Sequence, residues 1–132
     1  MSTIPVILTI AGSDCSGGAG IQADIKTISA LKGYAASVIT AVTAQNTTGV
    51  QAVYPIPPDI VRAQIISVTD DLQPAAIKIG MVHNAAIVHT IAECLQKYRS
   101  RFVVYDPVMV STSERKLMTE DTVCAIQNEL FP

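Results

Sequence analysis

The sequence predicts an α/β fold in which a mainly parallel β-sheet carries helices on both faces. Short β-branched runs alternate along the chain with segments whose apolar residues recur every three or four positions. Nearly half of the residues (49%) are apolar, 15% are charged, and the mean hydropathy is +0.39. Alternating strands and helices form parallel βαβ units, and a sheet covered on both faces needs this apolar composition.

In the first half of the chain, β-branched and small residues predict strands at 6–10 and 37–44 and a peripheral strand at 50–56. Ile21, Ile25, Ile28 and Leu31 have helical spacing, and Gly33 is placed to end that helix. The polar segment 45–49 has the composition of a loop.

The alternation continues in the second half. A helix is predicted to start at 57–59, followed by a strand at 75–79 that Gly80 closes. Asn84 can cap the next helix, and a strand at 102–105 ends at Asp106 and Pro107. The last helix starts at 119–121. The inward positions of the three helices are Val61, Ile65, Val68 and Leu72, then Ile87, Ile91, Leu95 and Tyr98, then Val123, Ile126 and Leu130.

No strand follows the last helix, so the apolar run 102–105 is expected at an open sheet edge, where unpaired strands invite aggregation. We therefore expect residues 1–132 to be the N-terminal portion of a larger domain whose sheet continues beyond the fifth or so strand.

Composition and charge argue against several functional classes. The net charge is −2, the isoelectric point is near 5.5, and the basic residues are scattered, so no nucleic-acid partner is expected. Three cysteines without paired spacing predict neither a disulfide framework nor a zinc site and favour the reducing cytoplasm. No apolar stretch is long enough for a membrane span, so no membrane partner is expected.

Polar clusters at 12–20, 45–49, 80–84 and 106–113 each follow a predicted strand, and together they predict a ligand site at one sheet edge. Segment 12–20 holds four glycines and opens a helix, so its bare amides and the helix N-terminus suit a polar or anionic small molecule. A tight connection without a ligand is the alternative.

Familiar catalytic motifs are missing. Gly18 stands where a phosphate-binding P-loop needs Lys, no GxGxxG occurs, and no base accompanies a serine nucleophile. His83 follows a strand at the predicted site edge, so a ligand contact remains open, whereas His89 falls within a helix.

Individual candidates each have a simpler interpretation. The side-chain amide of Gln45 offers a donor and an acceptor that match the edge of an aminopyrimidine. Alternatively, it forms hydrogen bonds to the backbone of a loop. Asp24 either accepts a hydrogen bond from a ligand amine or hydroxyl or is a surface carboxylate. Asp106 either lies near a metal-bound phosphate or is an ordinary turn residue. Cys15 is most simply a bystander near the helix N-terminus, while Met81 and Met109 line a flat ring or fill the core.

Five segments read together resemble the hydroxymethylpyrimidine/phosphomethylpyrimidine kinases of thiamin biosynthesis. They are 8–14, 16–24, 42–47, 78–81 and 106–109, with the sequences LTIAGSD, SGGAGIQAD, VTAQNT, KIGM and DPVM. The resemblance implies a three-layer αβα ribokinase-like fold and Mg-ATP-dependent phosphorylation of 4-amino-5-hydroxymethyl-2-methylpyrimidine and its monophosphate. It also implies a homodimer.

The resemblance assigns roles residue by residue. Substrate-binding positions are Gln45, Gly12, Ala19, Asp24, Met81 and Val108. Asp106 resembles the acidic position near the Mg-phosphates, with no direct metal ligand expected. The family's catalytic residue and most of its ATP site are expected beyond Pro132, so the chain alone should be inactive. Cys15 and Glu114 depart from the family pattern, and Glu114 puts the loop geometry at 111–115 in doubt. Pyridoxal kinase and a non-catalytic pyrimidine-binding or regulatory protein are the alternatives.

Overall fold

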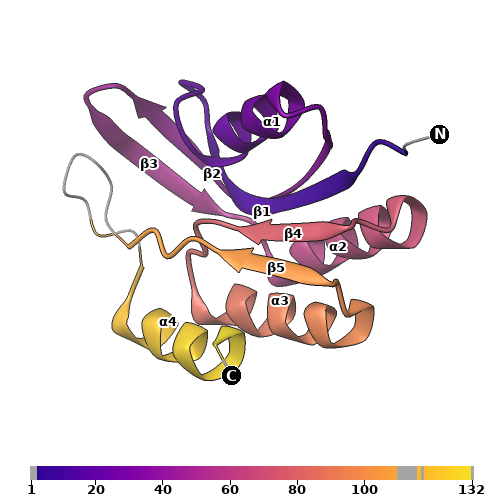
Figure 1. The fold of residues 1–132 in the computed structure, drawn as a ribbon. Helices are drawn as coiled ribbons and strands as arrows, with labels where there is room; N and C mark the ends of the chain where they lie inside the picture. The colour runs from indigo at the N-terminus through magenta and orange to yellow at the C-terminus, as the bar shows by residue number, and fades with distance from the viewer. Residues whose placement is uncertain (1–2, 110–115, 117, 132) are drawn as a thin grey trace.

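A five-stranded sheet forms the centre of the molecule in the computed structural model, which describes residues 3–109, 116 and 118–131. Its order is β3-β2-β1-β4-β5 (Figure 1). The strands are β1 (Val6–Asp14), β2 (Tyr34–Asn46), β3 (Gly49–Pro55), β4 (Ala76–Ile79) and β5 (Phe102–Tyr105). All neighbouring strands are parallel except β2 and β3, which form an antiparallel hairpin. The predicted α/β class and mainly parallel sheet are confirmed.

Helices cover both faces of the sheet. They are α1 (Gly20–Ala30), α2 (Pro58–Leu72), α3 (Ala85–Tyr98) and α4 (Glu120–Ala125), which continues as a π-helical turn, Ile126–Leu130. Figure 1 shows α1 on one face and α2, α3 and α4 on the other. The chain moves from β1 to β2 in one direction and then returns across β1 to β4 and β5. Right-handed crossovers in opposite directions require helices on opposite faces.

That reversal of direction places a switch point between β1 and β4. Loops leaving the carboxyl ends of these two strands go to opposite faces of the sheet, which opens a crevice between them. The predicted meeting of polar segments at one edge of the sheet depends on this geometry.

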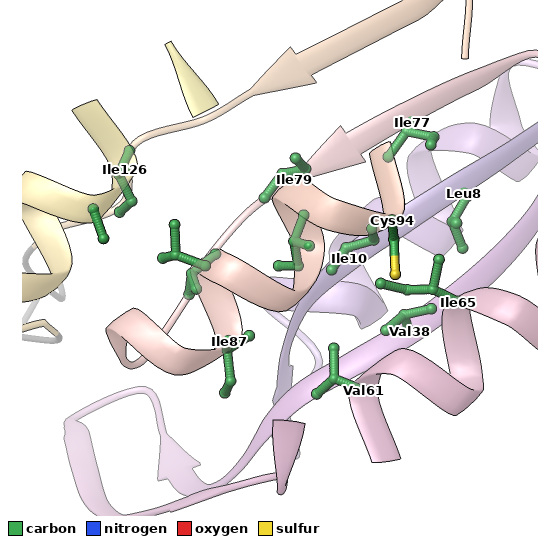
Figure 2. Close-up of a cluster of buried hydrophobic side chains, with 14 of the residues drawn as sticks. Leu8, Ile10, Val38, Val61, Ile65, Ile77, Ile79, Ile87, Cys94 and Ile126 are labelled. Atoms are coloured by element: carbon green, nitrogen blue, oxygen red, sulfur yellow. The ribbon is translucent and has the colours of Figure 1, made fainter. Parts of the chain in front are cut away.

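The main core lies between the sheet and α2, α3 and α4. Leu8, Ile10, Val38, Ile77 and Ile79 supply its sheet side (Figure 2). The helices supply Val61, Ile65, Ile87, Cys94 and Ile126. Within β1 and β4 these apolar residues occupy every second position, so the intervening Thr9 and Lys78 belong to the α1 face.

One expectation about element boundaries is wrong, and two helices end in ways that periodicity did not predict. Gln45 and Asn46 extend β2 and Gly49 begins β3, so the predicted loop 45–49 shrinks to a two-residue turn. The Asn46 Oδ1 atom accepts hydrogen bonds from Thr48 N at 2.9 Å and Gly49 N at 3.2 Å. These bonds close the chain into a tight turn, so no longer loop is needed. The last helix changes from α to π at Ile126. In addition, Lys32, at φ 64°, takes the left-handed position after α1 that the sequence assigned to Gly33.

Strand β5 forms an exposed edge. Phe102, Val103 and Val104 are 56%, 45% and 60% exposed, so the expectation of an apolar strand at an edge is confirmed for the described residues. Phe102 and Val104 pair in register with Ala76 and Lys78 and therefore share the α1 face. None of the helices in the described part of the chain is both long and apolar enough to cross a membrane.

Candidate functional site

A cavity of about 310 Å³ lies where β1, β2, β4 and β5 end. The seven residues that the sequence analysis assigned to a ligand site all line it: Gly12, Ala19, Asp24, Gln45, Met81, Asp106 and Val108. Its other lining residues include Asp14, Thr43, Val50 and Lys78. Ligand pockets usually enclose about 300–1,000 Å³, so this cavity has the size for a small molecule.

The glycine-rich turn after β1 is filled by the chain's own carboxylate. The Asp14 Oδ1 atom accepts from Ser16 N at 2.9 Å and Ser16 Oγ at 2.7 Å. The Oδ2 atom accepts from Gly18 N at 3.0 Å and Ala19 N at 2.8 Å. The expectation that these amides are bare and available to an anionic ligand is therefore wrong. Burial alone raises the pKa of Asp14, but these hydrogen bonds outweigh it and hold the pKa below its ordinary value of 3.8.

Two glycines allow the turn to pack against its neighbours. Gly20 has φ +58°, and a Cβ there would lie 2.2 Å from the Gly12 carbonyl oxygen. A Cβ on Gly12 would lie 2.5 Å from the Met81 Cε atom. Absence of side chains at both positions lets α1 start beside the end of β1 and lets Met81 form an apolar wall over Gly12.

Asp24 belongs to a three-residue cluster at the cavity. Thr9, fully buried in β1, donates its hydroxyl to Asp24 Oδ2 at 2.5 Å. The Lys78 Nζ atom lies 3.0 and 2.9 Å from the two carboxylate oxygens of Asp24. The side chains of Lys78 and Asp24 are 26% and 17% exposed, so this ion pair is largely shielded. Asp24 is thereby fixed in position and its charge is compensated.

Gln45 sits at the end of β2, where two contacts hold it. Its backbone N–H donates to Cys15 Sγ at 3.3 Å, and the thiol donates to Gln45 O at 3.1 Å. The Thr43 hydroxyl lies 3.1 Å from Gln45 Oε1 and 2.8 Å from Ser13 O. The single hydroxyl proton of Thr43 is shared between these two oxygens, which restrains the Gln45 amide oxygen. Among the contacts of the described residues, the NH₂ group and a second carbonyl lone pair are left for a ligand. Cys15, predicted to be a bystander, does not line the cavity but positions the backbone of a residue that does.

Asp106 follows β5 and is exposed at the cavity. Its backbone N–H donates to Ile79 O at 2.8 Å, which ties the segment to the end of β4. Burial raises the pKa of the neighbouring Tyr105, and the charge of Asp106 adds to that effect. Within 3–109, 116 and 118–131, no three His, Cys, Asp or Glu side chains gather into a metal-binding group. A single carboxylate does fit Mg²⁺ held mainly by phosphate and water, which is its usual mode beside nucleotides.

Comparison with known proteins identifies the family from 119 of the 132 residues, because the family model for phosphomethylpyrimidine kinase matches 14–132. The chain belongs to the phosphomethylpyrimidine kinase family. A hydroxymethylpyrimidine/phosphomethylpyrimidine kinase of Rhizobium meliloti is 54% identical over 96% of this chain and 47% of its own length.

Solved structures agree with this assignment. A phosphomethylpyrimidine kinase from Clostridium difficile superposes with a TM-score of 0.91 at 49% identity, over 97% of this chain and 55% of that one. A Staphylococcus aureus pyridoxal kinase in complex with pyridoxal gives 0.88 at 32% identity, over 99% and 47%. The chain spans about half or less of the length of the first curated relatives that it matches.

Several residues of this family member were missed or misplaced by sequence reasoning. Thr9 and Lys78 stand in the quoted family segments but were assigned no role, because their strands alternate in an ordinary way. Asp14 was counted with the polar turn rather than as its ligand. His83 does not line the cavity, and neither does Met109. His89 is exposed on α3, with Nδ1 2.6 Å from Glu129 Oε2. Glu114 and the loop 111–115 lie outside the described residues.

Proposed function

We propose that this chain binds 4-amino-5-hydroxymethyl-2-methylpyrimidine and its monophosphate as the phosphoryl acceptors of an ATP-dependent kinase of thiamin biosynthesis. The observation that carries the proposal is the single cavity lined by Gly12, Asp24, Gln45, Met81 and Asp106 in a member of this family. The names of its relatives supply the substrate.

The chemistry of the cavity supports an aminated flat ring. The Gln45 amide presents a donor and an acceptor side by side, which complements a ring nitrogen next to an exocyclic amine. Met81, Val108 and Ala19 offer apolar surface to the ring faces. Asp24 accepts from a donor group of the ligand. These residues bind and orient the acceptor, and orientation is a large part of catalysis of phosphoryl transfer.

The phosphoryl donor is part of the same proposal. When bound, Mg-ATP would supply the γ-phosphoryl group, and the exposed Asp106 carboxylate would lie near the Mg-phosphates without ligating the metal directly. We assign residues 1–132 to the substrate-binding part of a single ribokinase-like domain. We expect the nucleotide-binding part and the catalytic residue in the additional length of the relatives, of which this chain covers 47%.

Calorimetry with 4-amino-5-hydroxymethyl-2-methylpyrimidine tests the binding function directly. We expect saturable heat with the purified chain, and Gln45→Ala should weaken affinity about tenfold because the ring edge loses two hydrogen bonds. Gln51→Ala is the matched control, since Gln51 is exposed on β3 outside the cavity. Absence of heat at millimolar ligand, or equal affinity of both variants, would overturn the proposal.

Pyridoxal kinase is the second candidate, favoured by the 0.88 TM-score to the Staphylococcus aureus enzyme. Titrating pyridoxal in competition with the pyrimidine separates the two: the first proposal requires the pyrimidine to bind more tightly. A non-catalytic pyrimidine-binding protein is distinguished by turnover. Binding without ATP-dependent phosphorylation, in the presence of a relative's nucleotide-binding part, would favour it.

Assembly and location complete the proposal. We expect a homodimer, as the family resemblance implies, and a cytoplasmic location. Cys15, Cys94 and Cys124 are all free thiols, which supports a reducing compartment. Light scattering coupled to gel filtration measures the mass in solution, and a monomer at micromolar concentration would contradict the expected dimer.

A further inference from the structure

The partly buried ion pair between Lys78 and Asp24 calls for a functional reason. Burying such a pair costs hydration free energy, and the attraction between the two charges offsets this cost only in part. The pair therefore contributes little to the stability of the fold. The fold nevertheless makes room for it: a Cβ on Gly80 would lie 2.9 Å from Lys78 Nζ and 2.9 Å from Ala11 Cβ. Gly80 therefore allows the ammonium group to lie over the end of β4 and reach α1.

The bonding capacity of the pair is only partly used. Lys78 Nζ has three donors, of which two are directed at the oxygens of Asp24. The Asp24 carboxylate has about four acceptor positions, and Thr9 and Lys78 take three of them. Among the contacts of the described residues, one N–H and one lone pair are left, side by side in two residues that line the cavity.

A hydroxyl group is the ligand chemistry that uses both, because it donates one hydrogen bond and accepts others. An ammonium group would satisfy Asp24 but meet the like charge of Lys78. A methyl group would leave the remaining N–H of Lys78 and the remaining lone pair of Asp24 unbonded, which is costly in a shielded site.

We propose that Lys78 and Asp24 together recognise the hydroxyl of the ligand's hydroxymethyl group, with Lys78 donating to it and Asp24 accepting from it. Lys78 is then a specificity-determining residue that excludes cationic ligands. Thr9 is a positioning residue that holds the carboxylate. This inference rests on the proposed function and deepens it by assigning the group that separates the substrate from its analogues.

Three pyrimidines that differ only at position 5 test the assignment by calorimetry: the hydroxymethyl, methyl and aminomethyl compounds. The aminomethyl compound is an ammonium ion at neutral pH. The wild-type chain should bind the hydroxymethyl compound about tenfold or more tightly than either analogue, since one bond to a charged group is worth that much.

Lys78→Met should reverse the preference for the hydroxymethyl over the aminomethyl compound. With the ammonium of Lys78 removed, Asp24 is an uncompensated carboxylate, so the aminomethyl compound should bind better than the hydroxymethyl compound. A merely structural role for Lys78 would weaken all three ligands alike and leave their ratios unchanged. Lys97→Met is the control, because Lys97 lies on α3 over the Tyr98 ring, outside the cavity. Its ratios should equal those of the wild type.

Thr9 provides a second pair of variants in case Lys78→Met does not fold. Thr9→Val removes the hydroxyl at nearly constant volume and should reduce the hydroxymethyl-to-methyl ratio about threefold or more, whereas Thr9→Ser should retain it. If wild type binds both the hydroxymethyl and methyl compounds equally, this inference fails while the proposed function stands. If wild type binds none of the pyrimidines, both fail. An unchanged aminomethyl-to-hydroxymethyl ratio in folded Lys78→Met also overturns the inference.

Discussion

The Asp14 carboxylate takes the place of a ligand in the glycine-rich turn. Four donors from Ser16, Gly18 and Ala19 converge on it, and Asp14 itself is 3% exposed. The turn thereby acquires a fixed shape before any substrate arrives. Ala19, which the turn presents to the cavity, is positioned by this internal contact.

Replacing Asp14 with Ala should destabilise the fold by about 2–4 kcal/mol, because four donors of the turn lose the charged acceptor that holds them together. Urea unfolding measures the change. Asp71→Ala is the matched control, since Asp71 is exposed at the end of α2. Equal midpoints for both variants would show that the four bonds contribute no net stability.

Asp14 also predicts a dependence of stability on pH. Its pKa is lower in the folded chain than its ordinary value of 3.8, so the unfolded chain binds the proton more readily. The stabilisation is fully present above the unfolded pKa and is lost as the pH falls through the folded pKa. The difference in unfolding free energy between wild type and Asp14→Asn should be constant above about pH 5 and shrink below about pH 4. A difference that grows on acidification would contradict this.

Sequence reasoning identified the cavity residues that sit in distinctive local patterns and missed those whose role is set by tertiary contacts. Gly12, Gln45 and Asp106 follow the strands predicted from the sequence, where polar or glycine residues are conspicuous. Lys78 alternates with Ile77 and Ile79, so the sequence pattern alone makes it a solvent-facing residue. Only the packing of α1 against β1 and β2, together with the pairing of β4 beside β1, brings Asp24 to its ammonium group.

The connection between β1 and α1 is limited by the close approach of Gly20 to Gly12. Gly20→Ala should cost about 3 kcal/mol or more, because the added Cβ meets a backbone oxygen and the φ of +58° is strained for alanine. Gly18→Ala is the comparison within the same turn, since its Cβ would lie 3.7 Å from Asp14 Oδ2. Thermal unfolding that is equally affected by both substitutions would argue against a steric limit at Gly20.

Strand β5 has the features of an aggregation-prone edge, with three consecutive exposed apolar residues at 102–104. Phe102→Glu should reduce light scattering at high protein concentration while leaving the melting temperature close to that of wild type. Leu31→Glu is the control: Leu31 is 78% exposed after α1, away from any sheet edge. A similar gain from both variants would mean that added charge, not the edge, controls association.

For the elements, periodicity identified the strands and α-helices of the described chain, whereas side-chain bonds and strand pairing set their boundaries. Asn46 closes the β2–β3 turn through its side chain, which composition alone could not distinguish from a longer loop. Likewise, β1 continues to Asp14 because Ser13 and Asp14 still pair with Val42 and Thr43 after a register shift.

In the whole molecule, the cavity joins segments that are distant along the chain: the turn after β1, the start of α1 and the ends of β2, β4 and β5. A bound ligand contacts the native arrangement of all of them and none of the unfolded chain. The hydroxymethylpyrimidine at 100 times its dissociation constant should therefore raise the unfolding free energy by about 2.7 kcal/mol. Differential scanning fluorimetry should show a concentration-dependent shift that Gln45→Ala displaces to higher ligand concentration. A melting temperature independent of ligand would contradict a folded-state site.

The order of the strands, β3-β2-β1-β4-β5, was not available from periodicity, which indicates what each segment is but not its neighbours. The cavity residues could nevertheless be grouped without knowing the strand order, because polar segments that follow parallel strands meet at one edge of the sheet. The antiparallel placement of β3 follows from the short hairpin at Asn46, which leaves no room for a crossover helix.

The occupied turn after β1 has a consequence for interpreting glycine-rich sequences in general. A strand, a run of glycines and a helix are commonly taken to mark a phosphate loop. Here the Asp14 carboxylate already accepts hydrogen bonds from the amides of Gly18 and Ala19. An incoming phosphate would have to compete with this carboxylate, which the chain itself holds at very high effective concentration. A carboxylate four or five residues ahead of the amides that it bonds is thus a sign that the segment shapes a pocket wall and that phosphate binds elsewhere.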